Sequence, residues 1–212
     1  MKLYHFLSAE HALDDLTNWH IRISLIDELN DPFELWCVAQ DTPQLRQAMR
    51  DYKREMANRF GVLCFCRDWH NPVLWSHYAD RHRGICLGFE VDERCVHEVT
   101  YVESRVPITT PVTLDTASLL LYTKYRDWSY EQEFRGWFSL ETPDPGSGHY
   151  FYEFDDKIQL REVIAGPLCR TGDTEIRAAI GNRGAGVQVI PARLAFMDFR
   201  IVENLAGFRS LA

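Results

Sequence analysis

The sequence predicts an α+β protein with a mixed or antiparallel β core and flanking helices. Short segments of alternating or continuously apolar residues, which are typical of strands, recur along the whole chain. Few of these strand segments are separated by a helical pattern, so few βαβ units are expected. No linker is long or flexible enough to divide the 212 residues, and we therefore expect a single domain over residues 1–212.

The amino-terminal half holds the clearest alternation of strands and helices. Ser8 is suited to cap a helix because its hydroxyl accepts a hydrogen bond from a helical N–H group. Pro32 lacks an N–H donor and marks a turn at Leu29–Phe33. The strands expected here are residues 3–7, 20–25, 62–66 and 85–91. The helices expected here are residues 9–16, residues 43–59 with Gly61 as their end, and a short helical or irregular segment at 73–79.

The carboxy-terminal half is richer in short strands. The stretch Pro143–Gly148 combines proline, glycine and serine and is the clearest loop, after which residues 150–154 can pair as a hairpin. The other strands expected here are residues 97–102, 133–139, 163–165, 187–190 and 199–202. The helices expected here are residues 116–125 and 174–179.

The charge balance excludes one class of function. Lys and Arg number 23 against 31 Asp and Glu, for a net charge of −8, which disfavours coating of nucleic acid or anionic membrane through bulk charge. No run of about 18 apolar residues predicts a membrane span, and no signal peptide is evident. We therefore expect a cytoplasmic protein without a membrane partner. Aromatic residues make up 13% of the chain, and some of them can line a pocket for a flat ligand.

Several common catalytic and metal-binding motifs are missing. The six cysteines form no CxxC pair, so no zinc or other metal is expected, and Cys64 and Cys66 read as inert thiols on one face of a strand. The chain contains no GxxxxGK[ST], GxGxxG or GxSxG motif. A P-loop NTPase and a Rossmann dehydrogenase are thus disfavoured, and the signal for a catalytic nucleophile is weak.

One acidic segment is a candidate for chemistry. In Trp128–Arg135, the side chains of Glu131, Glu133 and Arg135 are expected on one face because strand side chains alternate. A glutamate held beside aromatic rings is a candidate working carboxylate. An exposed edge strand with an ion pair explains the same residues, and the pattern alone leaves both interpretations open.

Three histidines offer a second candidate. His70, His77 and His82 lie close together in the sequence, and such residues can bind a transition metal. Their spacing fits no zinc motif, so a solvated loop with one or two structural histidines is the favoured interpretation. A metal-dependent nuclease that uses them with Glu131 and Glu133 stays as an alternative.

Three segments together resemble the His-Tyr-Glu class of ADP-ribosyltransferases. They are Leu3–Leu7, then Leu74–Ala79 followed by Gly84–Val91, and Tyr130–Phe134. In that class a histidine on the first strand precedes a helix, a tyrosine follows a serine closely, and a strand carries a glutamate. The resemblance implies an ADP-ribosyltransferase-like split β core with flanking helices and NAD as the substrate.

The resemblance also implies roles for individual residues. His5 would bond the nicotinamide-side ribose, with Tyr4 and Phe6 beside it and backbone groups near His5 and Phe6 holding the amide. Ser76 and Tyr78 would also contact NAD, with Tyr78 stacked on the nicotinamide ring. Glu133 would bond the ribose 2′-hydroxyl and offset the positive charge that grows on the sugar. The residues given supporting roles are Glu131 for the acceptor nucleophile, Arg22 for the pyrophosphate, and Arg135 for an acceptor or phosphate contact.

The chain as a whole resembles the bacterial family labelled domain of unknown function 2971. The segments that carry this resemblance are Leu29–Glu34, Leu74–Ala79 and Trp128–Arg135, and it covers most of the chain. Of these, the Asn30-Asp31-Pro32-Phe33 turn has no counterpart in the transferase class, and it reads equally as a segment that closes over substrate or as a rigid turn.

The function implied is an NAD-dependent ADP-ribosyltransferase that releases nicotinamide. A bacterial toxin or phage-defence effector is expected, with a macromolecular acceptor (protein or nucleic acid) and an antitoxin or regulatory partner; a small-molecule acceptor also stays open. An NAD glycohydrolase is a close alternative, since water then replaces the acceptor. A non-catalytic binding module is the alternative from another class.

Overall fold

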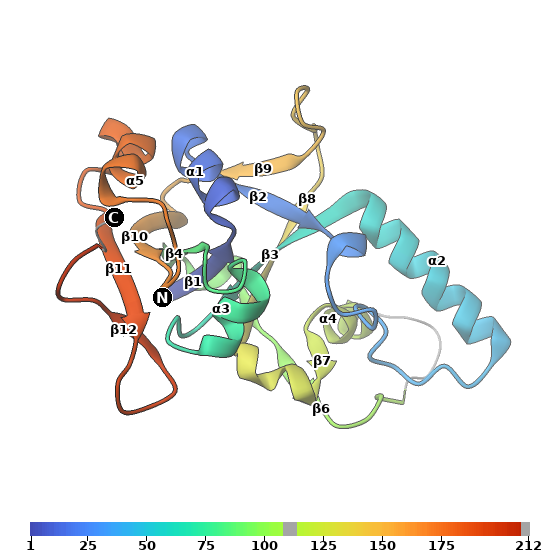
Figure 1. Ribbon diagram of the computed structural model, residues 1–212. Helices are drawn as coiled ribbons and strands as arrows, with labels where there is room; N and C mark the ends of the chain where they lie inside the picture. Colours follow the sequence, from blue (N-terminus) through green and yellow to red (C-terminus); the bar gives the residue numbers. More distant parts are fainter. Residues whose placement is uncertain (108–113, 209–212) are drawn as a thin grey trace. The chain divides into compact units, whose positions relative to one another are not determined.

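The computed structural model describes residues 1–107 and 114–208, and its chain divides into two compact units (Figure 1). Unit 1 comprises Met1–Ile21, Phe65–Cys95 and Tyr152–Ala212. Unit 2 comprises Arg22–Cys64 and Val96–Phe151. Each unit is built from segments distant in sequence, so its core forms only when those segments meet. The prediction of a single domain over residues 1–212 stays a prediction.

Unit 1 is built on a mixed, mostly antiparallel sheet. Its strands, in spatial order, are β12 (Ile201–Glu203), β11 (Gln188–Leu194), β10 (Ile158–Ala165), β4 (Ile85–Val91), β1 (Lys2–Leu7) and the end of β3 (Phe60–Cys66), which runs on from unit 2. Only the β10–β11 pair is parallel. The two central strands, β1 and β4, are rich in fully buried apolar side chains such as Leu3, Ile85, Leu87 and Phe89. This unit confirms the coarse prediction of an α+β fold.

Helices flank the sheet of unit 1. They are α1 (Ala9–Asn18), α3 (Pro72–Tyr78) and α5 (Asp173–Ile180), with short 3₁₀ turns η2 (Glu93–Cys95) and η4 (Gly181–Gly184). Ser8 caps α1 as predicted, since its hydroxyl accepts from the N–H group of His11 at 3.2 Å. Helix α1 packs against α5, and the two lie side by side in Figure 1. Because α5 joins the parallel strands β10 and β11, these three elements form a βαβ unit.

A left-handed turn follows α3. Asp80, Arg81 and His82 have φ values of 42°, 54° and 70°, a conformation that costs about 1–3 kcal/mol for each residue other than glycine. Backbone hydrogen bonds hold the turn, with the N–H of His82 donating to the carbonyl of Trp75 at 3.0 Å and the N–H of Gly84 to the carbonyl of Ala79 at 2.8 Å. These hydrogen bonds therefore hold the turn in a backbone conformation that its three residues do not favour by themselves.

Unit 2 packs helix α2 (Pro43–Arg59) on an apolar core. Leu45 and Met49 face inward from α2 onto a cluster that includes Leu35, Val38 and Leu120. The other helices are α4 (Leu114–Leu121), η1 (Ile26–Glu28) and η3 (Arg126–Glu131). The strands are β2 (His20–Leu25), the first part of β3, β5 (His97–Glu98), β6 (Thr100–Val102), β7 (Thr123–Tyr125), β8 (Glu133–Ser139) and β9 (Tyr150–Glu153). Strand β8 pairs with β3 and β5, and β6 pairs with β7 in parallel.

Several predicted boundaries are wrong. The helix expected at 116–125 ends at Leu121, because residues 123–125 form β7 and pair with β6. Gly61 lies inside β3 rather than ending α2; a Cβ there would come within 2.9 Å of the Ser24 carbonyl, so the strand needs glycine for close approach. The strand expected at 97–102 divides into β5 and β6, because Val99 between them donates its N–H to the Glu133 carbonyl.

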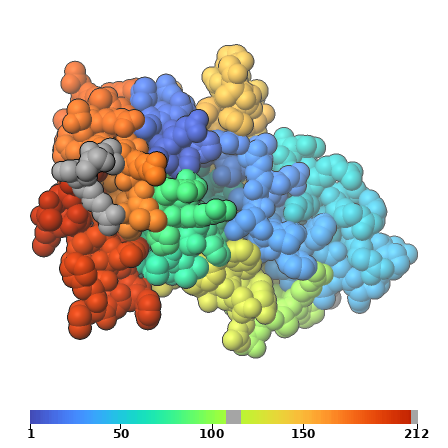
Figure 2. All heavy atoms as spheres, viewed as in Figure 1, coloured from blue at the N-terminus to red at the C-terminus, as the bar shows by residue number. Residues whose placement is uncertain are grey.

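The remaining features of the fold concern membrane-spanning potential and exposed apolar side chains. Along the described part of the chain, no helix is long and apolar enough to cross a membrane. The turn between β11 and β12 exposes large apolar side chains, with Phe196 at 86%, Met197 at 95% and Phe199 at 97% exposure. The red segment that carries this turn stands out from the surface in Figure 2, so these residues contribute nothing to the core.

Gly84 gives the first prediction. A Cβ at this position would lie 2.0 Å from the carbonyl oxygen of Leu7 and 2.9 Å from the backbone of Ala79, and neither atom can move away cheaply. We expect Gly84→Ala to lower the free energy of unfolding by about 1–3 kcal/mol, as measured by urea denaturation. The control is Gly146→Ala, whose new Cβ meets only Asp144 Oδ1 at 3.4 Å. Equal denaturation midpoints for Gly84→Ala and the wild type would contradict the packing described here.

Candidate functional site

A buried arginine organises the candidate site in unit 2. Arg135 lies on β8 and is only 1% exposed. Its Nε and Nη2 donate to the two carboxylate oxygens of Glu133 at 2.6 and 3.0 Å, and its Nη1 and Nη2 donate to the two oxygens of Glu34 at 2.7 and 2.6 Å. A fifth bond runs from Nη1 to the Leu121 carbonyl at 3.1 Å. These five bonds match the five N–H donors of a guanidinium group, so its hydrogen-bonding capacity is filled.

A second buried cation joins the carboxylates. Lys124 on β7 donates from Nζ to Glu131 at 2.6 Å and to Glu133 at 3.4 Å, and it lies 3.8 Å from a Glu34 oxygen. The Nζ atom also sits 4.5 Å from the centre of the Trp128 ring, a cation–π contact. Each of the three glutamates is at most 5% exposed. We call this set of five residues the charge cluster: Glu34, Lys124, Glu131, Glu133 and Arg135.

A tight turn delivers Glu34 to the charge cluster. Buried Asp31 accepts a hydrogen bond from the Phe33 N–H group at 2.9 Å, and its backbone carbonyl accepts from the N–H group of Glu34 at 3.1 Å. Leu35 then adopts a left-handed φ of 62° and places its side chain in the core. The Asn30-Asp31-Pro32-Phe33 turn therefore positions a carboxylate against Arg135, whose sequence number differs by 101.

The electrostatics of the charge cluster keep Glu133 and Lys124 ionised. Burial by itself raises the pKa of Glu133, but the nearby Arg135 and Lys124 lower it to below its ordinary value. Burial lowers the pKa of Lys124, yet Glu133, Glu131 and Glu34 raise it above its ordinary range. Three carboxylates against two cations leave the cluster with a formal charge of −1 when all are ionised.

Two polar neighbours complete the surroundings of Glu133. The Tyr101 hydroxyl oxygen accepts the Glu133 N–H at 2.9 Å. The thiol of Cys64, on β3, hydrogen-bonds the Glu133 carboxylate. Burial and the Glu133 charge raise the pKa of Cys64 well above its ordinary value, so the thiol stays protonated and is a poor nucleophile. The expectation that Cys64 is inert agrees with this.

The chemistry open to the charge cluster follows from its fixed charges. A carboxylate with a lowered pKa is a weak base near neutral pH, and the two cations hold their protons too tightly to act as acids. Glu131 bonds Lys124 at 2.6 Å, which occupies the carboxylate that was expected to act on an acceptor. The arrangement therefore supplies a fixed electric field rather than proton transfer. Glu133 and Arg135 share one face of β8 as expected, whereas the expectation for Glu131 is wrong in its reason: Glu131 ends η3, and the left-handed Gln132 separates it from the strand.

In unit 1, the residues of β1 divide between the two faces of the sheet. Phe6 meets Trp75 of α3 edge to face, with ring centres 5.0 Å apart, and Tyr4 lies on the same face because strand side chains alternate. His5 points to the opposite face, where it meets Phe65 at 5.9 Å. The structure therefore brings Tyr4 and Phe6 to the face that α3 covers, and it turns His5 away from that face.

The other predicted residues lie on separate elements. Ser76 is exposed and Tyr78 is half-buried at the end of α3, where the Tyr78 ring meets that of His77. Arg22, in unit 2, donates to both oxygens of Glu28 at 3.0 Å, so its guanidinium is engaged there.

The potential metal ligands gather elsewhere than the sequence suggested. Among the residues that the structure describes, one group has ligand atoms within 4.8 Å of one another: Asp14, Asp15 and His20, near the end of α1. No such group of three forms around His70, His77 or His82 in the described ranges. The His70 ring stacks on that of Trp69 and hydrogen-bonds the Asp68 carboxylate.

Sequence reasoning missed Glu34 and Lys124. Glu34 stood at the end of a segment noted for a turn and for a family resemblance but was given no role, and Lys124 fell at the end of a predicted helix. The one available signal was that charged residues in apolar surroundings need partners when they are buried. That rule says partners exist, but it does not say where along the chain they lie.

Arg135 gives a prediction of stability. Replacing it with methionine leaves Glu34 and Glu133 buried without their main partner, so Arg135→Met should lower the free energy of unfolding by about 3–5 kcal/mol in urea denaturation. The matched control is Arg126→Met, which removes an exposed ion pair with Glu103 and should cost under about 1 kcal/mol. A similar small cost at both positions would show that the charge cluster does not stabilise the fold.

Glu133 gives a prediction of pH dependence. Its pKa is lowered in the folded protein, so its contribution to stability is complete above the ordinary value of 4.5 and is lost as the pH falls through the folded value. The difference in free energy of unfolding between wild type and Glu133→Gln should therefore be largest near neutral pH and shrink below pH 4.5. The exposed Glu141→Gln serves as the control and should show no such trend. A difference that grows on acidification would reverse the assigned direction.

Comparison with protein-family models, with curated proteins and with solved structures finds no match to this chain. Both family resemblances accordingly stay predictions, and the function has to be argued from the geometry.

Proposed function

We propose that the protein is an NAD-dependent ADP-ribosyltransferase that releases nicotinamide, with Glu133 as its central carboxylate and with the split β core of that class. The reaction passes through a sugar cation, which a fixed negative charge stabilises. Glu133 is suited to this role because Arg135 and Lys124 keep its pKa low and its carboxylate ionised. This permanent charge is the observation that carries the proposal.

The rest of the charge cluster supports the same interpretation. Arg135 fixes both oxygens of Glu133, at 2.6 and 3.0 Å, so the carboxylate cannot rotate freely. A preoriented charge needs no reorganisation when the substrate's charge develops. Glu131, tied to Lys124, then serves as a positioning residue in place of a general base. The nicotinamide contact that the resemblance gives to Tyr78 is a separate part of the proposal.

A non-catalytic binding module is the second candidate, and one observation favours it. Glu133 is 4% exposed, and both of its oxygens already bond Arg135. A carboxylate so enclosed reaches a substrate only if part of the charge cluster opens. If it stays closed, the cluster is a structural feature and the protein acts through its surface alone. The nuclease alternative has no comparable support, because no metal-ligand group forms at the three histidines within the described ranges.

Nicotinamide release tests the proposal. Purified protein is incubated with NAD, alone and with protein, DNA or RNA acceptors, and free nicotinamide is measured by chromatography with and without chelator. We expect release that survives chelator and falls at least about 100-fold in Glu133→Gln, the scale for losing one preorganised charge. An NAD glycohydrolase would release nicotinamide without any acceptor, which separates it from the transferase.

Two further variants keep the outcome clear. Glu141→Gln makes the same chemical change on an exposed side chain of unit 2 and should keep full activity. Tyr78→Ala removes the ring that the proposal places against nicotinamide, so it should reduce release. Because Tyr78 is only half-buried, this variant can be assayed even where Glu133→Gln proves too unstable. If the wild type releases no nicotinamide with any acceptor, or if Glu133→Gln and Tyr78→Ala both release it at the wild-type rate, the transferase is refuted and the binding module is favoured.

A further inference from the structure

Unit 1 contains a cavity that the proposed function does not use. Its volume is about 360 Å³, within the range of small-molecule sites. It opens where β10 ends and the segment Gly166–Gly172 leads into α5, and β11 supplies Pro191 and Ala192 to its wall. The cavity lies at the carboxyl end of β10, where the chain leaves the sheet for α5 within the βαβ unit.

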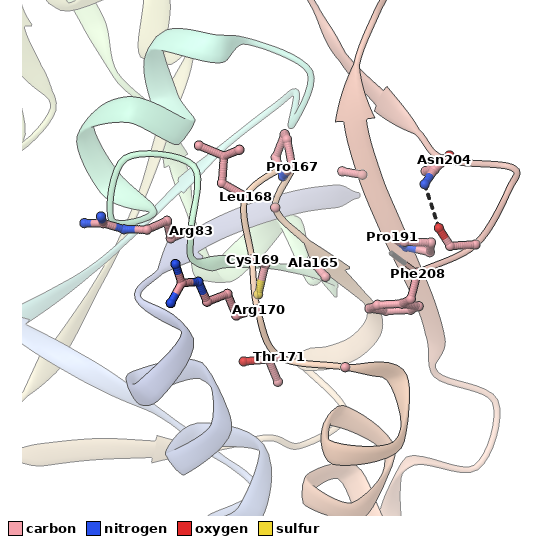
Figure 3. Close-up of a pocket in the computed structure, with 14 residues that line it drawn as sticks. Arg83, Ala165, Pro167, Leu168, Cys169, Arg170, Thr171, Pro191, Asn204 and Phe208 are labelled. Atoms are coloured by element: carbon pink, nitrogen blue, oxygen red, sulfur yellow. Dashed lines mark hydrogen bonds between the residues drawn. The ribbon is translucent and has the colours of Figure 1, made fainter. Parts of the chain in front are cut away.

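The charge of the lining is one-sided. Among the described residues of the lining, Arg83 and Arg170 are the charged ones and none is acidic, although the whole chain carries a net charge of −8. Arg83 bonds Asp80 at 2.8 and 3.0 Å, whereas Arg170 makes no hydrogen bond or ion pair with any residue in the described ranges. In Figure 3 both guanidinium groups lie on the same side of the Gly166–Thr171 segment.

The left-handed turn after α3 holds Arg83 at the cavity. The carbonyl of His82 accepts from the Leu168 N–H group at 3.0 Å, and the carbonyl of Gly84 accepts from the Gly166 N–H group at 3.0 Å. Those two bonds fix Arg83 against the segment that carries Arg170. The three successive left-handed residues that precede Arg83 therefore lie beside the cavity, and strained backbone of this kind is common at binding sites.

The other side of the cavity is apolar and partly flat. Phe208 and Pro191 lie there together with Asn204, whose side-chain amide donates to the Gly207 carbonyl at 2.6 Å (Figure 3). A ring can pack on such a surface at low entropic cost. The lining therefore has a cationic part and an apolar part, which is the pattern of an amphipathic ligand.

We propose that this cavity binds a phosphate monoester that carries a flat ring, the chemistry of a mononucleotide. Arg170, which has no partner in the described ranges, suits a doubly charged phosphate, since arginine pairs with it through two parallel hydrogen bonds. Arg83 adds a second positive group, whose Nη1 is left over from its bonds to Asp80. The ring lies toward Phe208 and Pro191. This site is independent of the charge cluster and of the proposed transferase activity.

Calorimetric titration of the whole protein with AMP, adenosine and inorganic phosphate tests the site. We expect AMP to bind, adenosine and phosphate each to bind more weakly, and Arg170→Glu to weaken AMP about tenfold to hundredfold. Arg83→Ala should weaken it as well. The matched control is Arg161→Glu, the same charge change at an exposed position of β10 outside the lining, which should keep wild-type affinity.

A second readout needs no variant. Cys169 lines the cavity and is half-buried, so bound AMP should slow its alkylation, measured by peptide mass spectrometry. Cys95, also half-buried but outside the lining, should react at an unchanged rate. The proposal is overturned if millimolar AMP does not bind, if adenosine or phosphate alone binds as tightly as AMP, or if Arg170→Glu leaves the affinity unchanged. None of these results depends on nicotinamide release, so the two proposals fail separately.

Discussion

The enclosed guanidinium of Arg135 is the constraint on which unit 2 depends. A cation that is 1% exposed costs a large desolvation energy unless its partners surround it. Those partners come from two stretches far apart in sequence, Glu34 from the turn after β2 and Glu133 from the same strand as Arg135. Bringing them together fixes that turn against β8. It also requires the turn to be rigid, which explains the buried Asp31 and the left-handed Leu35.

The same ion pairs set a conflict for catalysis. Arg135 and Lys124 keep Glu133 ionised in a site where burial alone would protonate it. They also occupy the carboxylate, because each hydrogen bond to a cation is one that a ribose hydroxyl would otherwise make. A reaction at Glu133 therefore requires a substrate that replaces part of this bonding. A non-catalytic binding module does not need its Glu133 hydrogen bonds replaced by a substrate. Whether unit 2 can catalyse a reaction therefore depends on whether the charge cluster opens.

Local pattern explains what the sequence predicted well and what it predicted poorly. Strand alternation placed Glu133 and Arg135 on one face, and both lie on β8 and bond each other. Glu131 ends η3 instead and meets the cluster through Lys124. The strand and helix order of unit 1 and the Ser8 cap also came from local signals. The contact of Glu34 with Arg135 spans 101 positions and depends on how segments assemble, which no local pattern encodes. Alternation also separates His5 from Phe6, but which of them faces α3 is decided by packing against Trp75.

Charge is distributed within the units in a way that the net value conceals. In unit 2 three buried carboxylates exceed two cations, and in unit 1 the cavity wall carries two arginines and no acid. A total of −8 thus disfavours coating of nucleic acid without bearing on a local site for an anion. The charges of the two sites also serve different purposes. The charge cluster stabilises a fold by satisfying buried charges, whereas Arg170 stands without a partner among the described residues and keeps its donors for a ligand. Of these two places, the exposed cationic wall is the one where Arg170 can bond an incoming anion without breaking old bonds, beside an Arg83 that already bonds Asp80.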